Sequence, residues 1–148
     1  MTITDSEWNR VSTAVHQACA GIPDVSPQAV LTEVERTVYP GISEDDLSLA
    51  QIMAARTLIE AEPGYSKVTA RLLLNRIRQQ ALAWLDCSPA TQQEMRDRYP
   101  AYFTAYVERG IELGQLDPQL AEFDLSQLGE ALIGENDLAF SFLGLQTL

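Results

Sequence analysis

The stretch SKVTARLLLNRIRQQALAW, residues 66–84, decides the fold class of this chain. Its apolar side chains recur at three- and four-residue spacing, and they are Val68, Leu72, Leu73, Ile77, Ala81 and Trp84. This spacing predicts a long amphipathic α-helix, because residues three and four apart lie on the same side of a helix. Pro63-Gly64 and Cys87-Ser88-Pro89 mark its two ends. A helix with one wide apolar face needs other helices to cover that face.

Helix start signals precede the segments on the N-terminal side of this stretch. Thr4-Asp-Ser-Glu7 has the spacing of a capping box, and Ser26-Pro27 pairs a capping residue with proline at the first helical position. Ser43 precedes three acidic residues, which favour the positive end of a helix dipole. We therefore expect three helices before the long one.

The C-terminal side is also expected to be helical. A helical region spans about residues 90–113 and is expected to be interrupted at Tyr99-Pro100, and Asp117-Pro118 and Asp124 start two short helices. The apolar segment 138–148 is expected to be buried, and its periodicity leaves helix and strand open. We predict an all-α bundle of about six to eight helices in two small lobes, residues 1–88 and 89–148.

Composition excludes several classes of function. The 148 residues are 46% hydrophobic and carry a formal net charge of −11, so the surface repels nucleic-acid phosphates. No apolar run is long enough to span a membrane, and no signal peptide is visible. The two cysteines lie far apart and suggest no disulfide framework, so we expect a cytoplasmic protein. Neither nucleic acid nor a membrane is an expected partner.

Candidate reactive side chains are few. The lone histidine, His16, has no partner at metal-ligand spacing and is interpreted as a surface or helix-packing residue. Cys19 ends an apolar helix face and is interpreted as a small buried hydrophobe, although a nearby base would make it a nucleophile. Cys87 lies beside Asp86, whose charge disfavours a thiolate.

Two clusters have both a functional and a structural interpretation. The acidic triplet Glu44-Asp45-Asp46 could bind a cation, but it lacks the ligand spacing of a calcium loop, and helix capping explains it. Aromatic residues at 99, 102, 103 and 106 could stack on bases, but their acidic neighbours favour a helix-packing face. No glycine-rich phosphate loop is present. We predict no catalytic, cofactor-binding or metal-binding residue and no cofactor in this chain.

Two ordered groups of short motifs carry a resemblance to a known family. The first group lies within Asp45–Arg78 and contains Ala54-Ala-Arg-Thr-Leu-Ile59, Pro63-Gly-Tyr65 and Ala70-Arg-Leu-Leu-Leu74. The second lies within Tyr102–Leu148 and ends in Phe142-Leu-Gly-Leu-Gln-Thr-Leu148. Together they resemble the N-terminal region of the ribonucleotide reductase large (alpha) subunit. Residues 1–88 would then be a partial, degenerate ATP-cone, and residues 89–148 the N-terminal helical segment.

The resemblance implies a part of an enzyme. The family's cone begins with a strand pair whose basic turn contacts phosphates, and this chain starts at a helix. Cone positions that usually hold His or Lys fall on Ser48 and Gln79. Phosphate needs N–H donors and cationic side chains, so we predict no binding of ATP or dATP. The family's thiyl-forming cysteine, redox cysteine pair and Asn/Glu pair have no matching motif, and Cys19 and Cys87 take no role from them.

The function implied by the resemblance is therefore a supporting one. The chain would be an N-terminal fragment or split subunit that packs on a separate catalytic barrel, the part that reduces ribonucleotides to deoxyribonucleotides. Through the barrel it would meet the small radical-generating subunit if the enzyme is of class I. The alternative is a stand-alone helical regulatory or adaptor module without catalysis.

Overall fold

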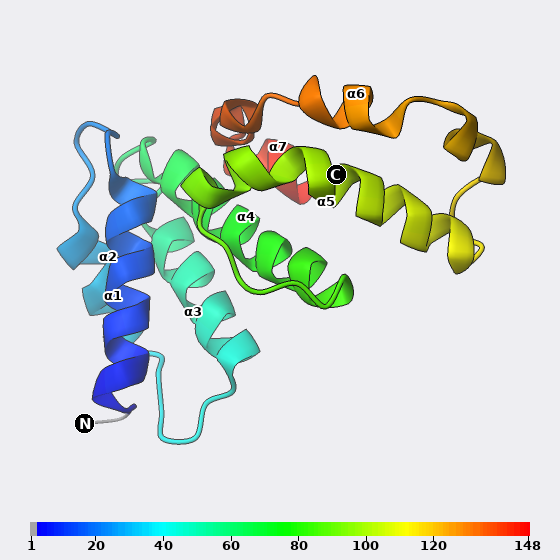
Figure 1. Ribbon diagram of the computed structural model, residues 1–148. Helices are drawn as coiled ribbons and strands as arrows, with labels where there is room; N and C mark the ends of the chain where they lie inside the picture. Colours follow the sequence, from blue (N-terminus) through cyan, green and yellow to red (C-terminus); the bar gives the residue numbers. More distant parts are fainter. Residues whose placement is uncertain (1–2) are drawn as a thin grey trace. The chain divides into compact units, whose positions relative to one another are not determined.

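The computed structural model describes residues 3–148, and every regular element in that range is a helix (Figure 1). The α-helices are α1 (Asp5–Cys19), α2 (Pro27–Glu35), α3 (Glu44–Thr57), α4 (Tyr65–Trp84), α5 (Gln92–Glu112), α6 (Leu125–Glu130) and α7 (Phe142–Gln146), and the 3₁₀ helices are η1 (Pro118–Glu122) and η2 (Gly134–Ala139). This confirms the predicted all-α fold. Among the described residues no helix combines the length and hydropathy needed to cross a membrane.

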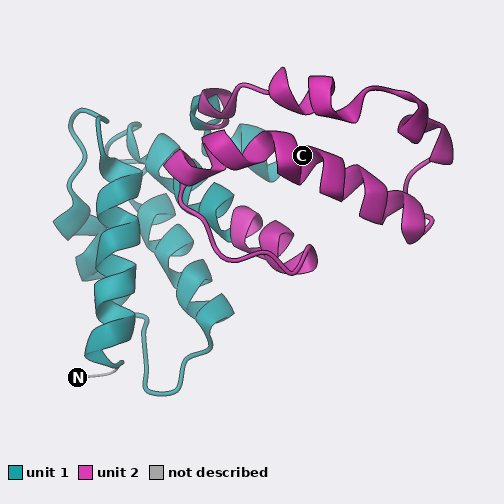
Figure 2. Ribbon diagram, viewed as in Figure 1, with its two compact units in different colours: residues 1–76, 138–148 teal, residues 77–137 magenta. Residues whose placement is uncertain are grey.

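The chain forms two compact units (Figure 2). Unit 1 contains the chain up to Arg76 together with Leu138–Leu148, and unit 2 is Ile77–Asp137. The division falls within α4, and the last segment returns to unit 1, so the units do not share the bounds of the predicted lobes, 1–88 and 89–148. The reason is that α4 is one continuous helix whose first part joins the core of unit 1, whereas Leu82 near its end packs in a separate cluster.

The first three helices of unit 1 begin at the predicted caps. Thr4 and Glu7 form the capping box, with the Thr4 N–H donating to a Glu7 carboxylate oxygen over 2.8 Å and the Glu7 N–H donating to the Thr4 hydroxyl over 3.2 Å. The Ser26 hydroxyl accepts from the N–H of Ala29, and the Ser43 hydroxyl accepts from that of Asp46. Each cap pairs an N–H that a helix start leaves without an intrahelical partner.

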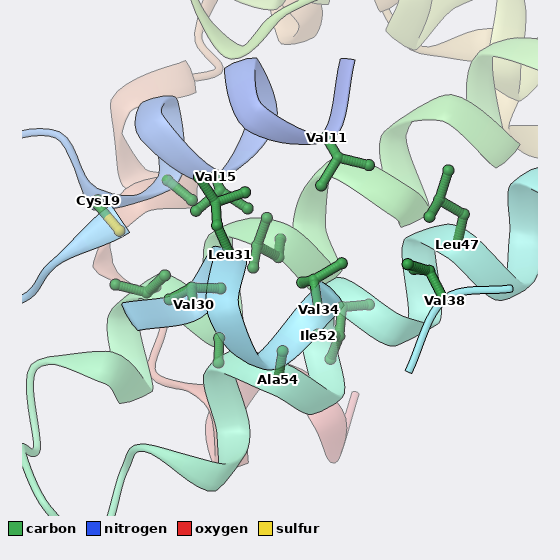
Figure 3. Packing of buried hydrophobic residues seen from close by; sticks show 14 of the residues in the cluster. Val11, Val15, Cys19, Val30, Leu31, Val34, Val38, Leu47, Ile52 and Ala54 are labelled. Carbon is green, nitrogen blue, oxygen red and sulfur yellow. The ribbon is translucent and has the colours of Figure 1, made fainter. Parts of the chain in front are cut away.

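The core of unit 1 is built from side chains spaced four residues apart. Val11 and Val15 of α1 face Val30 and Val34 of α2, and all four are at most 1% exposed (Figure 3). Residues of α3 and the first part of α4, including Ala55 and Val68, complete this cluster. Burying an aliphatic side chain of this size contributes about 1.5–3 kcal/mol.

The C-terminal end of α1 is held by an arginine of α4. Gly21 has a φ of +71°, in the left-handed region that glycine adopts without strain, and turns the chain away from the helix. The Arg71 guanidinium donates hydrogen bonds to the carbonyls of Ala18 (3.1 Å) and Ala20 (2.7 Å). A cation on these acceptors satisfies carbonyls that lack intrahelical partners and complements the negative end of the helix dipole.

The last segment of the chain packs on unit 1 as a helix, which settles the alternative left open by its periodicity. Ser141 caps α7, and the backbone N–H of Phe142 donates to the Ser66 hydroxyl over 3.3 Å. Phe142 and Leu145 are buried as expected. The expectation of burial is wrong for other residues, because a short helix turns only one face inward and leaves Leu143 72% and Leu148 89% exposed.

In unit 2, α5 runs through Pro100 without the predicted interruption. Proline removes one backbone donor and usually kinks or ends a helix. Here α6 packs against α5 at the same point, and the approach is so close that a Cβ at Gly129 would lie 2.7 Å from the carbonyl oxygen of Pro100. We attribute the continuity of α5 to this tertiary packing, which a local rule does not include.

Candidate functional site

The structure places the candidate reactive residues apart from one another. His16 is exposed, and its Nδ1 lies 2.7 Å from the carbonyl oxygen of Ser12 on the same helix. Cys19 is buried and Cys87 is exposed. Burial raises the pKa of the Cys19 thiol, and the nearby charge of Arg71 offsets this only in part. Among residues 3–148 no group of three His, Cys, Asp or Glu side chains is arranged to hold a metal ion.

Each of the three acidic residues at the start of α3 has a different side-chain partner. Glu44 pairs with Arg10 over 2.6 Å, and both oxygens of Asp45 accept from Arg76 over 2.8 Å. The Asp46 carboxylate accepts from the hydroxyl of the capping residue Ser43 over 2.7 Å. The triplet therefore caps α3 and ties it to α1 and α4, although ion pairs this exposed stabilise a fold by about 1 kcal/mol or less.

Two of the aromatic residues of α5, Tyr102 and Tyr106, pack as a helix face. The rings of Tyr102 and Tyr106 stack with centroids 6.1 Å apart, and Tyr106 lies 5.4 Å from Trp84 of α4. The guanidinium of Arg109 lies 5.4 Å from the centre of the Trp84 ring, which is a cation–π contact. These contacts join the end of α4 to α5 within unit 2.

Tyr99, which the sequence grouped with these rings, packs against the core of unit 2 and also belongs to a polar network. Its hydroxyl donates to the carboxylate of Asp137, next to Arg78, whose side chain donates to Gln92. Gln92 in turn donates to the carbonyl of Gly134 over 2.9 Å. Burial raises the pKa of Tyr99, and the hydrogen bond to Asp137 raises it further.

This network holds η2 against the first turns of α5. Arg78 is only 8% exposed, and burial of an unpaired guanidinium is costly, so its partners are essential to the packing of unit 2. Sequence reasoning missed the network because its hydrogen-bonded partners lie 14 to 45 residues apart in the sequence. The one signal of this network in the sequence was Arg78, which lies next to the apolar face of residues 66–84.

A second feature of unit 2 is an exposed surface, which we call the acidic apolar surface and define as residues 112–133. It contains five acidic residues and no Lys, Arg or His. Five of its large apolar side chains are at least 45% exposed, and they are Leu113, Phe123, Leu128, Leu132 and Ile133. Single exposed apolar residues are ordinary, whereas contiguous exposed apolar patches mark interaction sites. These five side chains are close to one another in the sequence. It is the strongest functional candidate that the structure offers.

The structure defines the chain as an all-α protein with exposed apolar side chains, a feature that marks candidate protein-binding surfaces. Comparisons with known proteins point to a more specific class of protein. No family model matches the chain. The chain is similar to ribonucleoside-diphosphate reductase subunit alpha from Chlamydia trachomatis serovar D and from Chlamydia muridarum, with 37% identity over 134 residues in each. The subunit from Chlamydia pneumoniae is 34% identical over 132 residues.

The similarity covers most of this chain and little of the relatives. The first two matches take in 89% of this chain, and the chain spans 12% of the length of all three curated relatives. The predicted resemblance to the ribonucleotide reductase large subunit is thus confirmed as a similarity to three curated alpha subunits over 12% of their length. The assignment of residues 1–88 to an ATP-cone stays a prediction.

Proposed function

We propose that this chain is the N-terminal region of a ribonucleotide reductase large subunit and supports catalysis by packing on the barrel that reduces ribonucleotides. The observation that carries the proposal is 34–37% identity to three alpha subunits across nearly all of this chain. The exposed apolar side chains of residues 112–133 support it, because a helical region that packs on a larger body needs such a surface. Through the barrel, the region would reach the radical-generating small subunit of a class I enzyme, in the cytoplasm.

The proposal includes a regulatory lobe that has lost its ligand. Residues 1–88 would be a degenerate ATP-cone that binds neither ATP nor dATP. In support, the side-chain amide of Gln79 donates to the backbone carbonyl of Ala90 over 3.1 Å, and Arg76 is paired with Asp45. Isothermal titration of the chain with each nucleotide tests this part, and micromolar binding of either one would contradict it.

Co-expression tests the main proposal. The tagged chain is produced together with the barrel-containing reductase polypeptide of the same genome; where one polypeptide carries both regions, it is expressed as two chains divided after Leu148. We expect a stoichiometric complex and higher reductase activity than the barrel polypeptide shows alone. Separate elution with unchanged activity would refute the proposal and favour a stand-alone adaptor module.

A further inference from the structure

We propose that the acidic apolar surface, residues 112–133, is the face that docks on the rest of the reductase large subunit, and that it fits a partner face with apolar side chains bordered by Lys and Arg. The inference rests on the proposed function. It adds the location of the contact and the chemistry of the surface on the other side.

The first argument is that unit 2 has a small core. Its cluster of buried residues consists of Leu82, Ala90 and Met95, with Tyr99 and Tyr102 packed against them. The corresponding cluster in unit 1 contains eighteen buried residues. A helical unit with so few buried residues has little hydrophobic stabilisation of its own and gains from being covered by another surface.

The second argument is that packing within unit 2 leaves two apolar side chains, one in α6 and one just after it, nearly half exposed. Gly129 brings α6 into backbone contact with α5 at Pro100. Leu128 and Leu132, on either side of Gly129 in the sequence, remain 45% exposed despite this contact. One side of the α5–α6 pair is therefore covered by the pair itself, and the apolar atoms that remain are available to a partner.

Local structure does not account for the exposed residues. Phe123 and Leu128 occupy the positions of a hydrophobic staple around the capping residue Asp124. Such a staple would bury its two side chains against each other, yet Phe123 is 61% exposed. Ile133, also 61% exposed, lies beyond the end of α6 and takes no part in a staple.

The negative charge of the acidic apolar surface favours a binding partner with positive charge. Two of its five carboxylates are caps: Asp117 accepts from the N–H of Gln119 over 2.9 Å and Asp124 from that of Gln127 over 3.0 Å. The other three, Glu112, Glu122 and Glu130, are exposed, and no ion pair within residues 3–148 involves them.

Like charges make most alternative occupants unfavourable. A second copy of this surface, an anionic membrane or a nucleic acid would each place negative charge against these carboxylates. A protein face that carries Lys and Arg around apolar side chains complements both the carboxylates and the exposed apolar side chains of this surface. The binding partner of the acidic apolar surface is therefore the remainder of the large subunit, which presents such a face.

Matched double variants test the location. Phe123→Ser with Ile133→Ser alters the acidic apolar surface. As a control, Leu49→Ser with Met53→Ser alters two exposed apolar residues of α3, which are 41% and 44% exposed. In the co-expressed complex we expect the first pair to weaken binding by at least about tenfold and the second by less than about twofold. Circular dichroism checks that each variant is folded.

Charge-reversal variants and hydrogen exchange test the inference independently of these double variants. Glu122→Lys with Glu130→Lys should also weaken binding, and raising the salt from about 50 to about 500 mM should weaken the wild-type complex more than that variant. Hydrogen exchange of the wild-type complex should show new protection within residues 113–133, a result that holds even if a variant fails to fold. A complex whose protection lies elsewhere overturns this inference and leaves the proposed function standing. Absence of any complex overturns both.

Discussion

Replacement of Gly129 by alanine tests the closest backbone approach in unit 2. A Cβ at this position would lie 2.7 Å from the carbonyl oxygen and 2.9 Å from the Cα of Pro100. Real Cβ atoms essentially never come this close to another heavy atom. Because both neighbours are backbone atoms of α5, no side-chain rotation relieves the contact, and α6 has to move away from α5.

The size of the effect follows from two opposing contributions. Overpacking of a well-packed contact costs about 1–3 kcal/mol, and the upper end applies when backbone has to shift. Alanine favours a helix over glycine by about 1 kcal/mol. We therefore expect Gly129→Ala to lower the free energy of unfolding of unit 2 by about 2 kcal/mol.

Tryptophan fluorescence gives a reporter for each unit. Trp84 lies in unit 2 and Trp8 in unit 1, and the chain has no other tryptophan. In a Trp8→Phe background, urea unfolding followed by Trp84 should show the midpoint of Gly129→Ala shifted to lower urea. Far-UV circular dichroism should show that the native helix content is kept.

The control is the same substitution in α7. A Cβ at Gly144 would meet the Ser141 hydroxyl oxygen at 3.4 Å, an ordinary contact. Gly144→Ala should therefore stabilise unit 1 by about 0.5–1 kcal/mol, measured with Trp8 in a Trp84→Phe background. If Gly129→Ala is neutral or stabilising as well, the described approach of α6 to α5 is wrong.

Three further outcomes follow from side-chain environments. Phe142→Ala should destabilise unit 1 by roughly 3 kcal/mol, whereas Leu143→Ala should change it by less than about 0.5 kcal/mol, and equal urea midpoints for the two variants would contradict the packing of α7. The pKa of Tyr99 is raised in the folded state, so the protonated hydroxyl stabilises the fold fully below the pKa of about 10 in the unfolded chain, and this stabilisation is lost as the pH rises further. The urea midpoint of unit 2 should therefore fall above that pH, and it should fall less in Tyr99→Phe. A thiol reagent should modify the exposed Cys87 at once and the buried Cys19 only on unfolding, and equal rates would show that the end of α1 is open.

Helix starts could be predicted from the sequence because the interactions that make them are local. Thr4, Ser26, Ser43 and Asp124 each accept from a backbone N–H three residues along the chain, a spacing that is visible in the sequence.

The errors arose where a distant segment decides the outcome. Pro100 was expected to interrupt α5, and the packing of α6 around Gly129 is not visible from neighbouring residues. The polar partners of Arg78 and Tyr99 come from η2 and the start of α5, so neither role follows from helical periodicity. The return of α7 to unit 1 could not be predicted for the same reason, since it depends on contacts with α3 and α4.

The return of α7 to unit 1 has a thermodynamic consequence for unit 2. All of Ile77–Asp137 lies between two segments that unit 1 holds in place, Arg76 on one side and Leu138 on the other. When unit 2 unfolds, it becomes a flexible loop with restrained ends, and such a loop has fewer conformations than a chain with a free end. The docking of α7, through the Phe142 ring 5.5 Å from the Arg56 guanidinium, therefore acts as a non-covalent cross-link that stabilises a unit to which it does not belong.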